Sequence, residues 1–183
     1  MHSARPRALI AGMGFLHRHE DLGGTRYQMR EKLFAIGDDY WIENENGDRV
    51  FKVNGKAMRA RETFILESPS GDEIFKIQEK KLSIRDKMEI EHDGKTVATI
   101  KKALVSPLRD RYSVEVEGGE DMEVKGNILD HEFEFERGGH KVAEASKRWL
   151  RVRDTYGVEI QPGQDDALIL ACTVCIDQMG RVG

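Results

Sequence analysis

The chain has 183 residues, of which 34% are charged and 39% hydrophobic, and its formal net charge is −4. This length suits one domain with its own core, and the apolar content is too high for a disordered chain. The negative charge argues against nucleic acid as a partner, because duplex binding usually needs a basic face. Two cysteines cannot form a disulfide framework, so we expect a reducing, cytoplasmic setting.

Residues 1–24 lack the regular pattern of the rest of the chain. The apolar run at 8–11 is too short for a signal peptide and is followed by Gly12 and Gly14. His17 and His19 stand beside acids, but a metal site needs a scaffold that fixes its geometry, so we expect none here. The sequence predicts a flexible tail at 1–24 and a single domain at 25–180.

A unit of about 24 residues recurs six times along this domain, and such a period indicates stacked supersecondary units. Each regular copy opens with Gly or Arg, followed by an acid, a variable residue and a large apolar residue. One of the six copies, the fifth in chain order, departs from this pattern. The copies begin with Gly37-Asp38-Asp39-Tyr40, Arg61-Glu62-Thr63-Phe64, Arg85-Asp86-Lys87-Met88, Arg109-Asp110-Arg111-Tyr112, Asp130-His131-Glu132-Phe133 and Arg153-Asp154-Thr155-Tyr156.

Within each unit, apolar and polar residues alternate, which predicts strands with one buried and one solvated face. The expected solvated face carries Glu89, Glu91, Glu115, Glu117, Glu134, Glu136 and Glu159. Tight turns are predicted at Asn46-Gly47, Ser70-Gly71, Asp93-Gly94, Gly118-Gly119 and Gly138-Gly139. Five hairpins, with further strands over Arg26 to Phe34 and Tyr156 to Ile160, give about twelve antiparallel strands.

The pattern changes after Gly163. Asp165 suits a helix N-cap, and the residues from Ala167 to Ile176 are apolar on every side. A helix of this length spans about 15 Å, roughly half of what a bilayer requires. Because such a helix must be surrounded by protein, we expect a mainly β fold: a closed antiparallel barrel of about twelve strands around a central hydrophobic C-terminal helix.

Several phrases together resemble the LURP-one-related family, which has the fold of tubby C-terminal domains and is related to phospholipid scramblases. They are Leu82-Ser83-Ile84-Arg85-Asp86-Lys87-Met88-Glu89-Ile90, Ser106-Pro107-Leu108-Arg109-Asp110-Arg111-Tyr112, Gly126-Asn127-Ile128-Leu129-Asp130-His131-Glu132-Phe133, Arg153-Asp154-Thr155-Tyr156-Gly157-Val158 and Asp165-Asp166-Ala167-Leu168. The resemblance spans about Thr25 to Met179 and implies the same barrel around a helix. The resemblance implies no catalytic motif. Tubby domains bind phosphoinositides.

Three groups of residues could be taken for catalytic sites. Cys172 and Cys175 match a redox spacing, but they lie deep inside an apolar run, where burial makes a thiol inert. The Arg-Asp pairs at Arg61, Arg85, Arg109 and Arg153 recur at one phase of the repeat, which favours a structural role. In a strand, His131 would point away from both of its acidic neighbours, so acid–base catalysis there is not expected.

The best candidate binding site is the run from Lys147 to Arg153. In a strand, Lys147, Trp149, Arg151 and Arg153 would share one face, with Arg148 beside them. Arginine suits phosphate, and tryptophan favours a membrane interface. The alternative is a solvated strand whose cations pair with neighbouring glutamates.

We therefore expect a non-enzymatic binding or scaffold domain without a cofactor or a transmembrane segment. Its partner would be an anionic phospholipid surface or another protein. The alternatives are an enzyme, thiol-dependent at Cys172 and Cys175 or hydrolytic around His131, and a scramblase-like activity.

Overall fold

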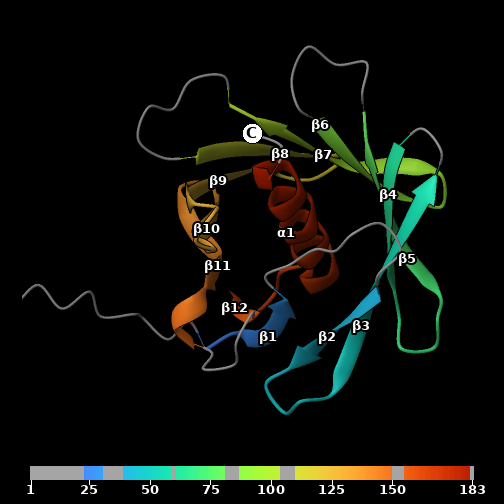
Figure 1. The fold of residues 1–183 in the computed structure, drawn as a ribbon. Helices are drawn as coiled ribbons and strands as arrows, with labels where there is room; N and C mark the ends of the chain where they lie inside the picture. Colours follow the sequence, from blue (N-terminus) through green and yellow to red (C-terminus); the bar gives the residue numbers. More distant parts are fainter. Residues whose placement is uncertain are drawn as a thin grey trace, which may run out of the picture.

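The computed structural model describes residues 23–30, 39–58, 61–80, 87–103, 110–149 and 155–181. In this part of the chain, twelve antiparallel strands close into a barrel around one helix (Figure 1), so the predicted fold class is confirmed. The strands are β1 (Thr25–Arg30), β2 (Asp39–Asn44), β3 (Arg49–Met58), β4 (Arg61–Glu67), β5 (Glu73–Glu79), β6 (Lys87–His92), β7 (Lys95–Lys102), β8 (Asp110–Val116), β9 (Met122–Asn127), β10 (Glu132–Arg137), β11 (His140–Ser146) and β12 (Thr155–Ile160).

Each strand pairs with its neighbours in the chain, and β1 closes the barrel against β12, with Tyr27 opposite Val158. Tight turns of the predicted kind connect the two strands of each predicted hairpin. At the β6–β7 turn, Asp93 and Gly94 both have positive φ, 49° and 74°, as a two-residue hairpin turn requires. The predicted strand over Arg26 to Phe34 ends at Arg30, and Phe34 lies outside the described residues.

Helix α1 (Asp166–Arg181) runs through the middle of the ring of strands in Figure 1. Asp165 is its N-cap, because its Oδ1 accepts a hydrogen bond of 3.0 Å from the Leu168 amide. The central turns, including Leu170 and Val174, are fully buried against the inward faces of the strands. The helix continues beyond the predicted end at Ile176, and the extension includes the buried carboxylate of Asp177.

The two ends of the barrel differ. The β2–β3, β4–β5, β6–β7, β8–β9 and β10–β11 hairpin turns lie at the end where α1 begins, which we call the hairpin end. The β9–β10 turn at 128–131 lies at the other end, where α1 finishes, since a Cβ on Gly180 would stand 2.8 Å from Ile128 Cγ2. We call this the helix-exit end.

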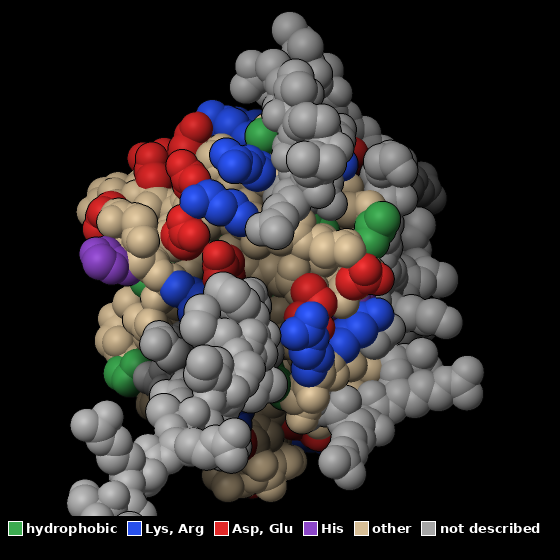
Figure 2. All heavy atoms as spheres, turned by 90° about the vertical axis from the view of Figure 1, so that its left-hand side faces the viewer, with side chains coloured by type: hydrophobic (Ala, Val, Ile, Leu, Met, Phe, Trp, Pro, Cys, Tyr) green, Lys and Arg blue, Asp and Glu red, His purple; other side chains and the backbone are tan. Residues whose placement is uncertain are grey.

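The outer surface of the barrel carries lysines and glutamates that pair across strands. Lys101 contacts Glu115, and Lys76 lies 3.5 Å from Glu91. Figure 2 shows the same mixture of basic and acidic side chains on the side of β9 to β11. Such exposed pairs contribute little to stability individually, typically below about 1 kcal/mol each.

One glutamate of the predicted solvated face is buried. Glu159 is only 2% exposed, because every residue of β12 is buried on both faces of the sheet. Its carboxylate lies 3.3 Å from Arg26 Nε on the neighbouring strand. The expectation of a solvated Glu159 is therefore wrong, because other residues of the protein cover the outer face of β12 at this point.

Candidate functional site

The predicted basic segment begins with a short 3-10 helix, η1 (Lys147–Trp149), directly after β11. The expectation that this segment continues as a strand is wrong for these three residues. Glu132 Oε1 accepts hydrogen bonds from the Ser146 hydroxyl (3.0 Å) and the Lys147 amide (3.1 Å). The Ser146 hydroxyl in turn accepts one from the Arg148 amide (3.2 Å). These bonds turn the chain away from the sheet.

Trp149 lies against the outer face of β12. A Cβ on Gly157 would stand 2.9 Å from the indole Cε3, so only a glycine there lets the ring approach so closely. The Arg26 guanidinium lies over the ring, 5.8 Å from its centroid, within the range of a cation–π contact. The half-buried indole therefore forms part of the cover that buries Glu159.

Arg26 contacts this indole, and two further cations, Lys147 and Arg148, precede it on η1. Arg26 pairs with Glu159, whereas Arg148 Nε lies 3.6 Å from Glu132 Oε2 and its side chain is 65% exposed. Lys147 is partly exposed on the same short helix. Arg151 and Arg153 of the predicted site lie outside the described residues. We refer to Arg26, Lys147, Arg148 and Trp149 as the η1 corner.

The positions of the recurring Arg-Asp pairs cannot be described. The side chains of Arg61, Arg85, Arg109 and Arg153 all lie outside the part of the structure that is described. Their predicted structural role stays a prediction.

The structure separates the side chain of His131 from that of Asp130. His131 occupies the β9–β10 turn with a φ of 51°, and its side chain is buried while that of Asp130 is exposed. Its Nδ1 lies 3.2 Å from Asp177 Oδ1, and Tyr156 donates its hydroxyl hydrogen to Asp177 Oδ2. Asp177 was not among the residues predicted from the sequence, although an acid directly after a fully apolar helical run indicates a need for buried partners.

Cys172 and Cys175 are fully buried within α1, as predicted. Burial raises the pKa of both thiols well above the ordinary value, so the reactive thiolate is disfavoured at neutral pH. A disulfide exchange mechanism would need at least one of them exposed.

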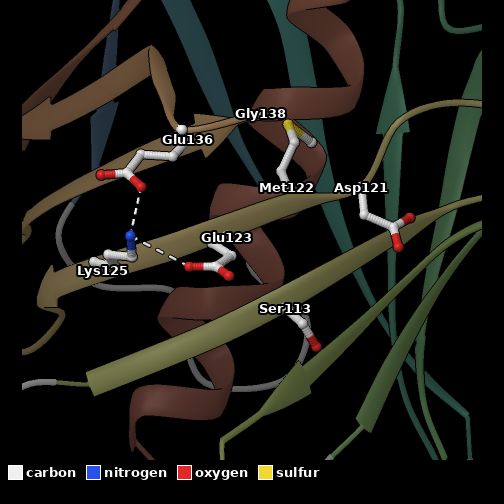
Figure 3. A pocket seen from close by; sticks show the side chains of 8 residues that line it. Ser113, Asp121, Met122, Glu123, Lys125, Glu136 and Gly138 are labelled. Atoms are coloured by element: carbon white, nitrogen blue, oxygen red, sulfur yellow. Dashed lines mark hydrogen bonds and ion pairs between the residues drawn. The ribbon is translucent and has the colours of Figure 1, made fainter.

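A groove of about 460 Å³ lies on the outside of β8 to β10 (Figure 3). It is lined by Ser113, Asp121, Met122, Glu123, Lys125, Glu136, Gly138 and Gly139. Lys125 Nζ contacts Glu136 Oε2 at 2.5 Å and Glu123 Oε2 at 3.2 Å, and these carboxylates raise the pKa of the lysine. With its lysine held by two acids, the groove does not suit an anion. The groove was not predicted from the sequence.

Two further observations concern membrane spans and metal sites. No helix in the described ranges combines the length and the apolar character needed to cross a bilayer. The same ranges contain no group of three or more His, Cys, Asp or Glu side chains placed to hold a metal ion. The histidines at 17 and 19 lie outside them.

The strands and the buried helix define a closed β-barrel domain with a hydrophobic helix in its interior. The sequence profile of the LURP-one-related family matches residues 25–177, and the chain belongs to this family. It is 25% identical over 151 residues to YxjI, an uncharacterized protein of Bacillus subtilis (strain 168), with 82% of this chain and 91% of that protein covered. An Arabidopsis thaliana protein of known X-ray structure shares the fold, with a TM-score of 0.63 at 18% identity, covering 88% of this chain and 97% of that one.

Proposed function

We propose that the chain is a non-enzymatic binding or scaffold domain whose ligand site lies on the outside of the barrel. The observation that carries this proposal is the filled interior. Helix α1 occupies the space that a barrel of this type would otherwise offer to a ligand, and its central side chains are fully buried. A ligand therefore has to bind the outer surface or an end.

The η1 corner is the part of the described surface that suits an anionic lipid headgroup best. Arg148 is largely exposed on a short helix, next to Lys147 and an indole held against Gly157. Guanidinium groups bind phosphate through paired hydrogen bonds, and tryptophan favours the interface between water and lipid. Arg151 and Arg153, a few residues further on, would extend the same basic segment. In the cytoplasm, the partner would be the anionic inner leaflet of a membrane.

Vesicle sedimentation tests this proposal. The chain should sediment with vesicles of phosphatidylcholine and phosphatidylserine, and much less with phosphatidylcholine alone. Each basic residue near such a surface contributes about 1 kcal/mol. Reversing two charges, Lys147→Glu with Arg148→Glu, should therefore weaken binding at least about thirtyfold.

A matched control carries the same change in net charge at the other end of the barrel. Arg49→Glu with Lys95→Glu alters two residues near the hairpin end, and the Arg49 side chain is 63% exposed, close to the value for Arg148. The control should bind almost as the parent chain does. Equal losses in the two variants, or a parent chain that ignores anionic vesicles, would contradict the proposal.

A further inference from the structure

We infer that Leu129 is the apolar contact that this domain inserts into the lipid surface, beside the basic residues of the η1 corner. This inference rests on the function proposed above. Within the described ranges, Leu129 is the one large hydrophobic side chain that is exposed, at 70%. A lone exposed leucine is ordinary on a protein surface. The geometry of its turn and the place of that turn on the barrel set Leu129 apart.

Hydrogen bonds within the turn brace the segment that carries Leu129. The His131 amide donates to the Ile128 carbonyl (3.0 Å), and the Asn127 side chain bonds both the side chain and the amide of Asp130. Leu129 and Asp130 are exposed, while the flanking residues Ile128 and His131 are buried. The turn thus presents Leu129 to solvent from a hydrogen-bonded base, which lowers the backbone entropy lost when the turn is ordered on binding.

Leu129 and the η1 corner lie at the same end of the barrel. Glu132, three residues after Leu129, begins β10, and its carboxylate accepts the hydrogen bond from the Lys147 amide and lies near the Arg148 guanidinium. One carboxylate, directly after the leucine turn, therefore contacts the Lys147 backbone and the Arg148 guanidinium. Both features lie at the helix-exit end, opposite the hairpin end.

A lipid surface needs this combination. Stable attachment to a membrane generally takes two signals, a basic group for the headgroups and an apolar group for the acyl boundary. The η1 corner supplies the first signal but only a half-buried indole, whereas Leu129 supplies an exposed aliphatic group. A free phosphate or a soluble headgroup would gain nothing from Leu129, so the leucine distinguishes a lipid surface from a soluble anion.

A fluorescent label can test the insertion directly. Because Cys172 and Cys175 are fully buried, a thiol-reactive, polarity-sensitive dye should label Leu129→Cys at the new residue alone. Ser70→Cys, in the exposed β4–β5 turn at the hairpin end, is the matched control. With vesicles of phosphatidylcholine and phosphatidylserine, the dye at 129 should shift to the blue and be quenched by lipids brominated on their acyl chains. The dye at 70 should not respond.

A second variant measures the contribution to binding without a dye. Leu129→Ser keeps the charge and removes most of the apolar surface, so it should weaken vesicle binding roughly tenfold and leave the salt dependence unchanged. It should also leave binding of soluble inositol hexakisphosphate unchanged. The inference on Leu129 is overturned alone if Leu129→Ser binds vesicles as tightly as the parent and the dye at 129 stays in water. In that case the parent still binds vesicles and the Lys147→Glu, Arg148→Glu variant does not. A parent chain that does not bind anionic vesicles overturns both proposals.

Discussion

The imidazole ring of His131 stacks on the phenol ring of Tyr156, with 4.3 Å between the ring centroids and 16° between the ring planes. Both side chains also reach Asp177 near the end of α1. The cluster joins the β9–β10 turn, β12 and the helix. It therefore holds the last turns of α1 inside the barrel and fixes the base of the turn that carries Leu129.

Removing the carboxylate from this cluster should destabilise the protein. Asp177→Ala leaves the buried Tyr156 hydroxyl and the His131 imidazole without the group they share, and we expect a loss of about 2–4 kcal/mol in the free energy of unfolding. Urea unfolding followed by circular dichroism measures this. Glu45→Ala, at an exposed acid in the β2–β3 turn, should change stability by less than about 0.5 kcal/mol. Similar values for the two variants would mean that the cluster has no stabilising role.

The N-cap of α1 should be measurable on its own. Asp165→Ala removes the acceptor of the Leu168 amide and should lower the free energy of unfolding by about 1 kcal/mol. Asp165→Asn keeps an acceptor oxygen at the cap and should recover most of that loss. If the asparagine variant is as unstable as the alanine variant, the capping bond does not explain the effect.

The two cysteines should not react in the folded protein. Both are fully buried, and burial raises the pKa of each thiol, so the thiolate is scarce at neutral pH. A chromogenic disulfide reagent should titrate no thiol in the native protein and both thiols in guanidinium chloride. Rapid reaction of either cysteine under native conditions would contradict the burial of α1 and reopen the thiol-dependent alternative.

The contact between Trp149 and Gly157 should show coupling in a double-mutant cycle. Gly157→Ala places a methyl group 2.9 Å from the indole and should cost about 1–3 kcal/mol, because the ring must move. The same substitution in a Trp149→Ala background should cost much less, since the obstacle is gone. Additive losses in the double variant would show that the indole does not occupy this position in solution.

The barrel could be predicted because its signals are local. Alternation along each strand, the Gly turns such as Asp93-Gly94, and the acid at Asp165 each act within a few residues. The apolar run in α1 also had to be enclosed by protein, whichever strands surrounded it. Local pattern and fold therefore agree over most of the described chain.

The candidate site was less predictable, because distant residues determine it. The chain turns into η1 at Lys147 because the carboxylate of Glu132, on another strand, captures its amide. In the same way, Asp177 finds its partners on β12 and in the β9–β10 turn, and Glu159 is buried by the approach of Arg26. No spacing within a single segment reports contacts of this kind.

The central claim, that ligands bind outside a filled barrel, is tested most directly by NMR of the isotope-labelled chain with nanodiscs of phosphatidylcholine and phosphatidylserine. We predict that signals of Lys147, Arg148 and the Trp149 indole shift or broaden, while methyl signals of the buried α1 residues Leu170 and Ile176 stay in place. Shifts concentrated on those helix methyls, with the η1 corner unaffected, would mean that the ligand enters the barrel and would contradict the account.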